Sequence, residues 1–174
     1  MIKTKKINQQ NGNKLVIDYG LRNDQYFSIT GLIYDYNVKG PDKCILGGCI
    51  HDEILKECPE FSDLVNLHLS DKEGQPMHAI DNGFYYYQMS RGFAAHYKTV
   101  EGDKERLEKV LMEHLRTSEQ ETAEILRVLD KAMNCGDKKF GERMAKKFFE
   151  EYIIRELRPR WQIEATAAIK KYDL

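Results

Sequence analysis

The hydrophobic pattern of this chain changes at the glycine pair Gly47-Gly48. Before this pair, β-branched and aromatic residues gather in short runs, as is typical of strands. After it, apolar residues recur at helical spacing. We therefore predict an α+β fold, in which a small antiparallel β-sheet at the N-terminus is packed with a helical C-terminal half.

The strand-rich part covers residues 1–46. Strand formers concentrate in Leu15–Tyr19 and again in Tyr26–Tyr36, and Arg22-Asn23-Asp24 between them has the composition of a hairpin turn. This pattern predicts two or three antiparallel strands.

Residues 47–100 form a histidine-containing segment of helices and loops. The pattern predicts a helix that begins at His51 and is stopped by Pro59, a second helix over Phe61–Leu69, and a third that begins near Pro76. Each helix carries one apolar stripe, which is expected to face the sheet.

Residues 101–174 are helical throughout. Ser118 and Glu121 have the spacing of a capping box, Gly136 is placed to end that helix, and Pro159 is expected to break the helical pattern that follows. No stretch has the composition of a linker, so we expect residues 1–174 to form a single domain.

Charge and cysteine content restrict the classes of partner and compartment. The 27 basic and 28 acidic residues leave a formal net charge of −1, so nucleic-acid contact requires a local basic patch. No segment is apolar enough to span a bilayer, and the four cysteines follow no CxxC spacing. We expect a cytoplasmic protein with free thiols and no membrane contact.

Three of the five histidines lie between Gly47 and Asn82, together with several carboxylates. Histidine transfers protons near neutral pH, and a neighbouring carboxylate can orient it or raise its pKa. The sequence therefore predicts the following candidate catalytic residues for acid–base chemistry: His51, Glu53, His68, Asp71 and His78.

Structural roles for the same histidines stay open. His68 lies between two leucines of an amphipathic helix, where an interior or boundary histidine is the commoner case. His51 and His78 are equally compatible with exposed positions next to helix starts. A zinc site formed by these three histidines with Cys49 is chemically admissible. Its spacing matches no recognised motif, so the sequence assigns no metal and no cofactor.

Basic residues gather late in the chain. A solvated helix face explains them most simply, and an RNA- or partner-binding strip is the sharper alternative. The residues of that strip are Lys146, Lys147, Arg155, Arg158 and Arg160.

Two motifs, GGCIHDEI at 47–54 and LHLSDKEGQPMHAIDNG at 67–83, resemble a family of small proteins carried by phages, plasmids and other mobile elements. Small proteins of such elements often act as counter-defence factors, including anti-CRISPR proteins. The resemblance thus implies that the partner is a CRISPR effector nuclease or its guide RNA, in the host cytoplasm.

The leading hypothesis is a CRISPR inhibitor, acting by histidine-dependent, metal-independent cleavage or by binding of guide RNA. Two alternatives stay open. One is a protein-binding module without catalysis, and the other is a small zinc- or histidine-dependent hydrolase.

Overall fold

The computed structural model describes residues 1–35, 43–77, 102–113 and 115–174. The chain forms two compact units, one of Met1–Gly74 with Gln162–Leu174 and the other of Gln75–Trp161. Each unit has its own cluster of buried apolar side chains. That all 174 residues form one domain stays a prediction.

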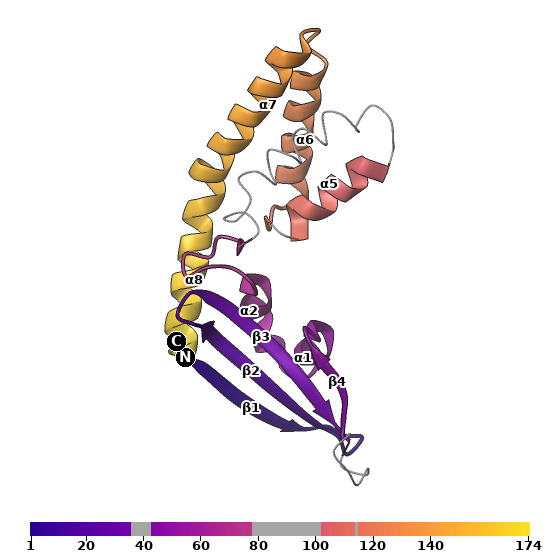
Figure 1. Cartoon of the computed structure of the whole chain (residues 1–174), viewed down its shortest axis with the longest axis vertical. Coiled ribbons are helices and arrows are strands. Elements are labelled where there is room, and N and C mark those ends of the chain that lie inside the picture. Colours follow the sequence, from indigo (N-terminus) through magenta and orange to yellow (C-terminus); the bar gives the residue numbers. More distant parts are fainter. Residues whose placement is uncertain (36–42, 78–101, 114) are drawn as a thin grey trace. The chain divides into compact units, whose positions relative to one another are not determined.

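The first unit is built on a four-stranded antiparallel sheet (Figure 1). Its strands follow the order of the chain: β1 (Ile2–Asn8), β2 (Lys14–Arg22), β3 (Tyr26–Tyr34) and β4 (Cys44–Gly48). The predicted α+β class, with a sheet at the N-terminus and a helical C-terminal half, is confirmed.

The sequence pattern indicated the two central strands, β2 and β3, and missed the two edge strands, β1 and β4. On β1 the half-buried positions include Lys3 and Lys5, so the strand lacks the apolar alternation by which strands are recognised. All five residues of β4 are exposed. The predicted hairpin turn is present, with Asn23 and Asp24 in the left-handed region that such turns require.

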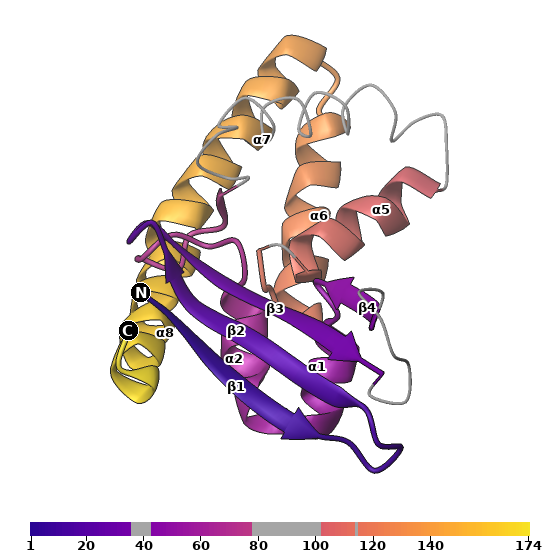
Figure 2. The same ribbon diagram turned by 60° about the horizontal axis from the view of Figure 1, so that its bottom comes forward.

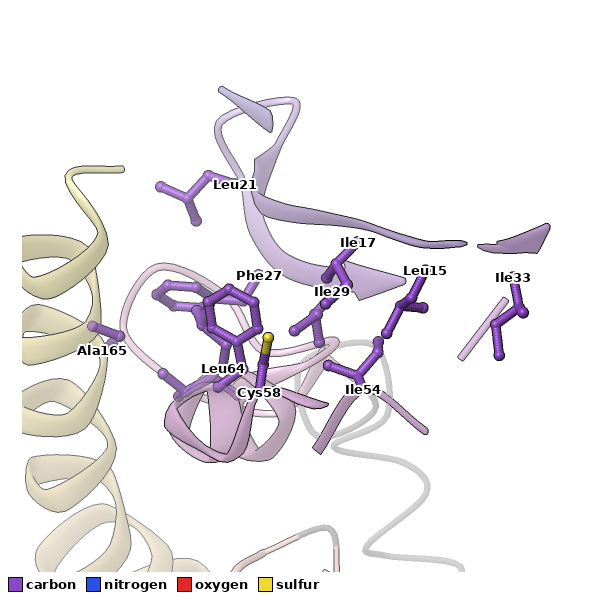
Figure 3. Close-up of a cluster of buried hydrophobic side chains, with 13 residues drawn as sticks. Leu15, Ile17, Leu21, Phe27, Ile29, Ile33, Ile54, Cys58, Leu64 and Ala165 are labelled. Atoms are coloured by element: carbon purple, nitrogen blue, oxygen red, sulfur yellow. The ribbon is translucent and has the colours of Figure 1, made fainter. Parts of the chain in front are cut away.

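Short helices cover one face of this sheet (Figure 2). They are α1 (His51–Glu57), the 3₁₀ turn η1 (Pro59–Phe61) and α2 (Ser62–Leu67), and the C-terminal part of α8 (Arg158–Tyr172) packs beside them. Apolar side chains from the sheet, the short helices and α8 meet in one cluster (Figure 3). Its fully buried members include Leu15, Ile17, Phe27, Ile29, Ile54 and Leu64.

The second unit contains α5 (Gly102–Glu113), α6 (Glu119–Met133), α7 (Lys138–Tyr152) and the start of α8. The predicted capping box is confirmed: the Ser118 side chain accepts from the Glu121 N–H, and the Glu121 carboxylate accepts from the Ser118 N–H. Trp161 is fully buried in the apolar cluster of this unit.

The predicted break at Pro159 is wrong. The chain passes from α7 through a π-helical turn, η2 (Ile153–Leu157), directly into α8. Pro159 is the second residue of α8 and follows the π turn, a place where the hydrogen-bonding register changes and a missing N–H is tolerated.

The expected third helix near Pro76 falls mostly outside the described residues. No helix within the described ranges has both the length and the apolar character needed to cross a membrane.

Candidate metal centre

Gly48 ends β4 and turns the chain toward α1. Its φ of +105° lies in a region that side chains rarely adopt, so glycine suits this turn. The turn places Cys49 at the surface just beyond the strand, and His51 becomes the first residue of α1 two positions later. The backbone conformation of one glycine therefore brings a thiol and an imidazole to the same end of β4.

His68 reaches the same place from the end of α2. Beyond it, Leu69 donates its N–H to the Phe27 carbonyl, and Phe27 returns its own N–H to the Ser70 carbonyl. These bonds attach the segment to the edge of β3 beyond the last residue paired with β4, Gly31. The Ile29 N–H lies between the two pairings and donates to Nδ1 of His68 at 3.1 Å. His68 thus completes the hydrogen bonding of this edge.

Cys49, His51 and His68 converge. Sγ of Cys49 lies 3.3 Å from Nε2 of His68, and the rings of His51 and His68 meet edge to face with centroids 4.8 Å apart. One potential ligand atom from each of the three residues lies within 4.8 Å of the other two. Cys49 is exposed and the two histidines are half-buried, so the cluster opens to the surface.

The hydrogen bonds fix the protonation of His68. Because Nδ1 accepts from Ile29, the ring proton of the neutral form is on Nε2, which then donates to the Cys49 sulfur. Burial, together with the smaller effects of the nearby charges of His51 and Arg22, lowers the pKa of His68 to about 4. His68 is therefore neutral at pH 7, with both ring nitrogens engaged, and is poorly suited to proton transfer.

His51, unlike His68, has a ring nitrogen that is not engaged in a hydrogen bond with any described residue. Its Nε2 is buried and has no hydrogen-bond partner among the described residues. A buried polar atom left unpaired costs roughly 1–3 kcal/mol, so such an atom needs an explanation. A lone pair on this nitrogen directed at a bound ion provides one.

The donor set suits zinc. Thiolate and imidazole are its preferred ligands, and bonds of about 2.3 Å to sulfur and 2.0–2.1 Å to nitrogen place neighbouring tetrahedral ligands about 3.5 Å apart. The 3.3 Å between Cys49 and His68 is close to that separation. For Nε2 of His68 to ligate, its proton has to leave, and a neutral ring then carries its hydrogen on Nδ1, opposite the Ile29 N–H. Zinc binding through Nε2 therefore requires loss of the hydrogen bond from the Ile29 N–H to His68.

The other predicted catalytic residues have different partners. The Glu53 carboxylate pairs with Lys56 Nζ at 2.5 Å, and Oδ1 of Asp71 accepts from the Glu73 N–H at 2.9 Å. His78 lies outside the described residues. The structure thus brings together His51 and His68 of the predicted set, and joins to them Cys49, which the sequence had placed only in the zinc alternative.

Two of the late basic residues are paired within their own helix, α7. Lys146 lies 3.5 Å from Glu150, and Lys147 lies 3.9 Å from Glu151. Both pairs have the i,i+4 spacing of a solvated helix face. Arg160 is held in the second unit, where it donates to both carboxylate oxygens of Glu121 and to the Arg116 carbonyl. Arg155 and Arg158 are exposed. A binding role for this strip stays a prediction.

Comparison with known proteins adds no relative: no family model, no curated protein and no solved structure matches this chain. The interpretation of the site depends on its own geometry.

Proposed function

We propose that this chain binds a divalent transition-metal ion, zinc before others, through Cys49, His51 and His68. The observation that carries the proposal is the convergence of three zinc-type donor atoms within 4.8 Å, from the end of β4, the start of α1 and the end of α2. The buried Nε2 of His51, which has no hydrogen-bond partner in the described part of the chain, supports it independently. One thiolate with two imidazoles favours zinc over magnesium or calcium, which prefer oxygen ligands.

The energetic balance favours binding. Loading would release the thiol proton of Cys49, move the ring proton of His68 from Nε2 to Nδ1, and leave the Ile29 N–H without its acceptor, which costs roughly 1–3 kcal/mol. Structural zinc sites bind with roughly 10–16 kcal/mol, so a three-ligand site with part of that energy still exceeds the loss. Because ligands must release protons, we expect affinity to rise with pH across the range where thiols ionise.

The chemical class that follows is metal-dependent hydrolysis. A zinc ion held by three protein ligands polarises substrate oxygens and lowers the pKa of a bound water. In this chain Cys49 would supply the anionic ligand, and His51 and His68 the neutral ones. The thiolate would reduce the positive charge of the ion. We propose metal-dependent hydrolysis in place of acid–base catalysis by free histidines, because a neutral His68 with both ring nitrogens in hydrogen bonds is poorly suited to transfer protons.

The metal content of the purified protein tests the proposal. We expect about one zinc per chain by elemental analysis, and loss of most of it in Cys49→Ser and in His51→Ala. Cys44→Ser is the matched control, because Cys44 is also an exposed thiol at one end of β4 and is not part of the cluster. Absence of metal from protein reconstituted with zinc, or equal loss in the Cys44 variant, would refute the proposal.

A counter-defence role is a second candidate function. It is supported by the resemblance to mobile-element proteins, and by the position of the cluster, whose three residues all belong to the two motifs that carry this resemblance. In this role the chain would inhibit a CRISPR effector by contact with the nuclease or its guide RNA.

Incubation with guide RNA, with and without the effector, separates the mechanisms of that second role. Cleavage in EDTA that disappears in His78→Ala would favour the histidine-dependent ribonuclease. Cleavage only after zinc is added would favour the metal centre as the catalyst. Intact RNA with suppressed effector activity would leave a binding protein, and full effector activity throughout would refute the counter-defence role.

A further inference from the structure

We infer that the metal ion at this site keeps a coordination position that faces solvent and takes an exchangeable anionic ligand. The inference rests on the metal site proposed above and assigns the class of ligand that the site accepts: hydroxide and the oxygen anions of carboxylates and phosphate esters.

Exposure of the cluster supports an accessible position. The two histidines are half-buried, while Cys49 is exposed. In the described part of the chain, no group lies within 4 Å of the place where a Cβ of the preceding residue, Gly48, would stand, so the turn before Cys49 is not covered on that side. Three donors leave one position of a tetrahedral ion for a further ligand, and within the described ranges the open side is the approach from solvent.

Charge favours an anion in that position. A divalent ion, one thiolate and two neutral imidazoles carry a net single positive charge. Arg22 adds a second positive charge at the end of β2, where it pairs with Tyr26, three positions along β3 from the Ile29 that bonds to His68. Arg22 is exposed at the end of β2 and has no salt bridge to any described residue. Arg22 can therefore attract an anion to the ion without itself holding the metal.

Cobalt in place of zinc makes the exchange visible. We expect Co²⁺-loaded protein to show tetrahedral absorption bands, and a thiolate-to-cobalt charge-transfer band that is absent in Cys49→Ser. Azide added to the loaded protein should shift the tetrahedral bands saturably, and acetate or phosphate should compete with it.

Arg22→Gln tests the charge argument. This variant should hold cobalt at the same stoichiometry and bind azide roughly two- to fivefold more weakly at low salt. Lys6→Gln is the matched control, since Lys6 is an exposed cation of β1 outside the cluster, and its azide affinity should be unchanged.

The outcomes separate the two proposals. Cobalt bands that azide does not shift, at any concentration the folded protein tolerates, would overturn the open position and leave the metal site. Equal azide affinity in Arg22→Gln and wild type would overturn the role of Arg22. Failure of the wild-type protein to give cobalt bands would overturn the metal site itself, and the open position with it.

Discussion

The backbone N–H of Ile29 donates a hydrogen bond to Nδ1 of His68 across 3.1 Å, which joins the edge of the sheet to the candidate metal centre. Through this bond a change at the metal site would reach β3. Three predictions follow from this bond and from the contacts around it, and a fourth follows from the capping box of the second unit.

Metal loading should alter the Ile29 amide. A neutral imidazole that ligates through Nε2 carries its hydrogen on Nδ1, where it opposes the Ile29 N–H, so this hydrogen bond has to lengthen or break. We expect a large chemical-shift change and faster hydrogen exchange at Ile29 on addition of zinc. Ile17, buried in the neighbouring strand, is the control and should change little. An Ile29 amide that is identical with and without bound zinc would exclude ligation by Nε2.

His68→Ala should destabilise the metal-free protein more than His51→Ala does. Removal of His68 leaves the Ile29 N–H without its acceptor, which is expected to lower the free energy of unfolding by roughly 1–3 kcal/mol. Removal of His51 takes away a buried nitrogen that has no partner among the residues the structure describes, so its effect should be smaller or stabilising. Urea unfolding in the presence of a chelator measures both. A larger loss in His51→Ala would contradict the assigned hydrogen bonds.

Stability of the metal-free protein should fall as the pH is lowered from about 6.5 toward about 4. The pKa of His68 is lowered from 6.5 to about 4 in the folded state, so within this window the unfolded chain binds a proton that the folded chain does not. The contribution of His68 to the free energy of unfolding therefore rises with pH between about 4 and about 6.5, and is constant above that range. Carboxylates also titrate there, so the measurement is the difference between wild type and His68→Gln in urea unfolding at several pH values. Parallel pH profiles would count against a depressed pKa.

The capping box of α6 should stabilise the second unit. Ser118→Ala removes the acceptor of the Glu121 N–H, and is expected to lower the free energy of unfolding by roughly 0.5–2 kcal/mol. Glu119→Gln, an exposed change in the same helical turn, is the control and should have a smaller effect. Thermal unfolding followed by circular dichroism is suitable for both, and equal midpoints for Ser118→Ala and wild type would show that the cap contributes nothing.

Local patterns predicted the parts of the fold that local interactions determine. The β-branched and aromatic runs of β2 and β3, the turn at Asn23, the start of α1 at His51 and the Ser118 capping box all follow from neighbouring residues. The edge strands were missed because β1 places lysines at half-buried positions and β4 is wholly exposed. Such strands form because β2 and β3 offer them hydrogen bonds, which no short window of sequence encodes.

The candidate metal centre also depends on contacts between distant residues, which local sequence patterns do not predict. Clustering of histidines in the sequence indicated the correct segment, but the spacing of Cys49, His51 and His68 matches no zinc motif. Their convergence depends on the Gly48 turn and on the bonds between Phe27 and the Leu69-Ser70 segment, residues more than 40 positions apart. Only the folded chain shows that Cys49 belongs with the histidines.

The pairing of Leu69 and Ser70 with Phe27 makes the three donors a property of the folded state alone. In the unfolded chain Cys49 and His51 are separated from His68 by a flexible segment, so the three donors seldom meet. An ion that binds the folded chain selectively stabilises it by roughly 2.7 kcal/mol at a free concentration one hundred times the Kd. The concentration of available metal would then set how much of the protein is folded, and the abundance of the chain in a cell would depend on zinc supply as well as on synthesis.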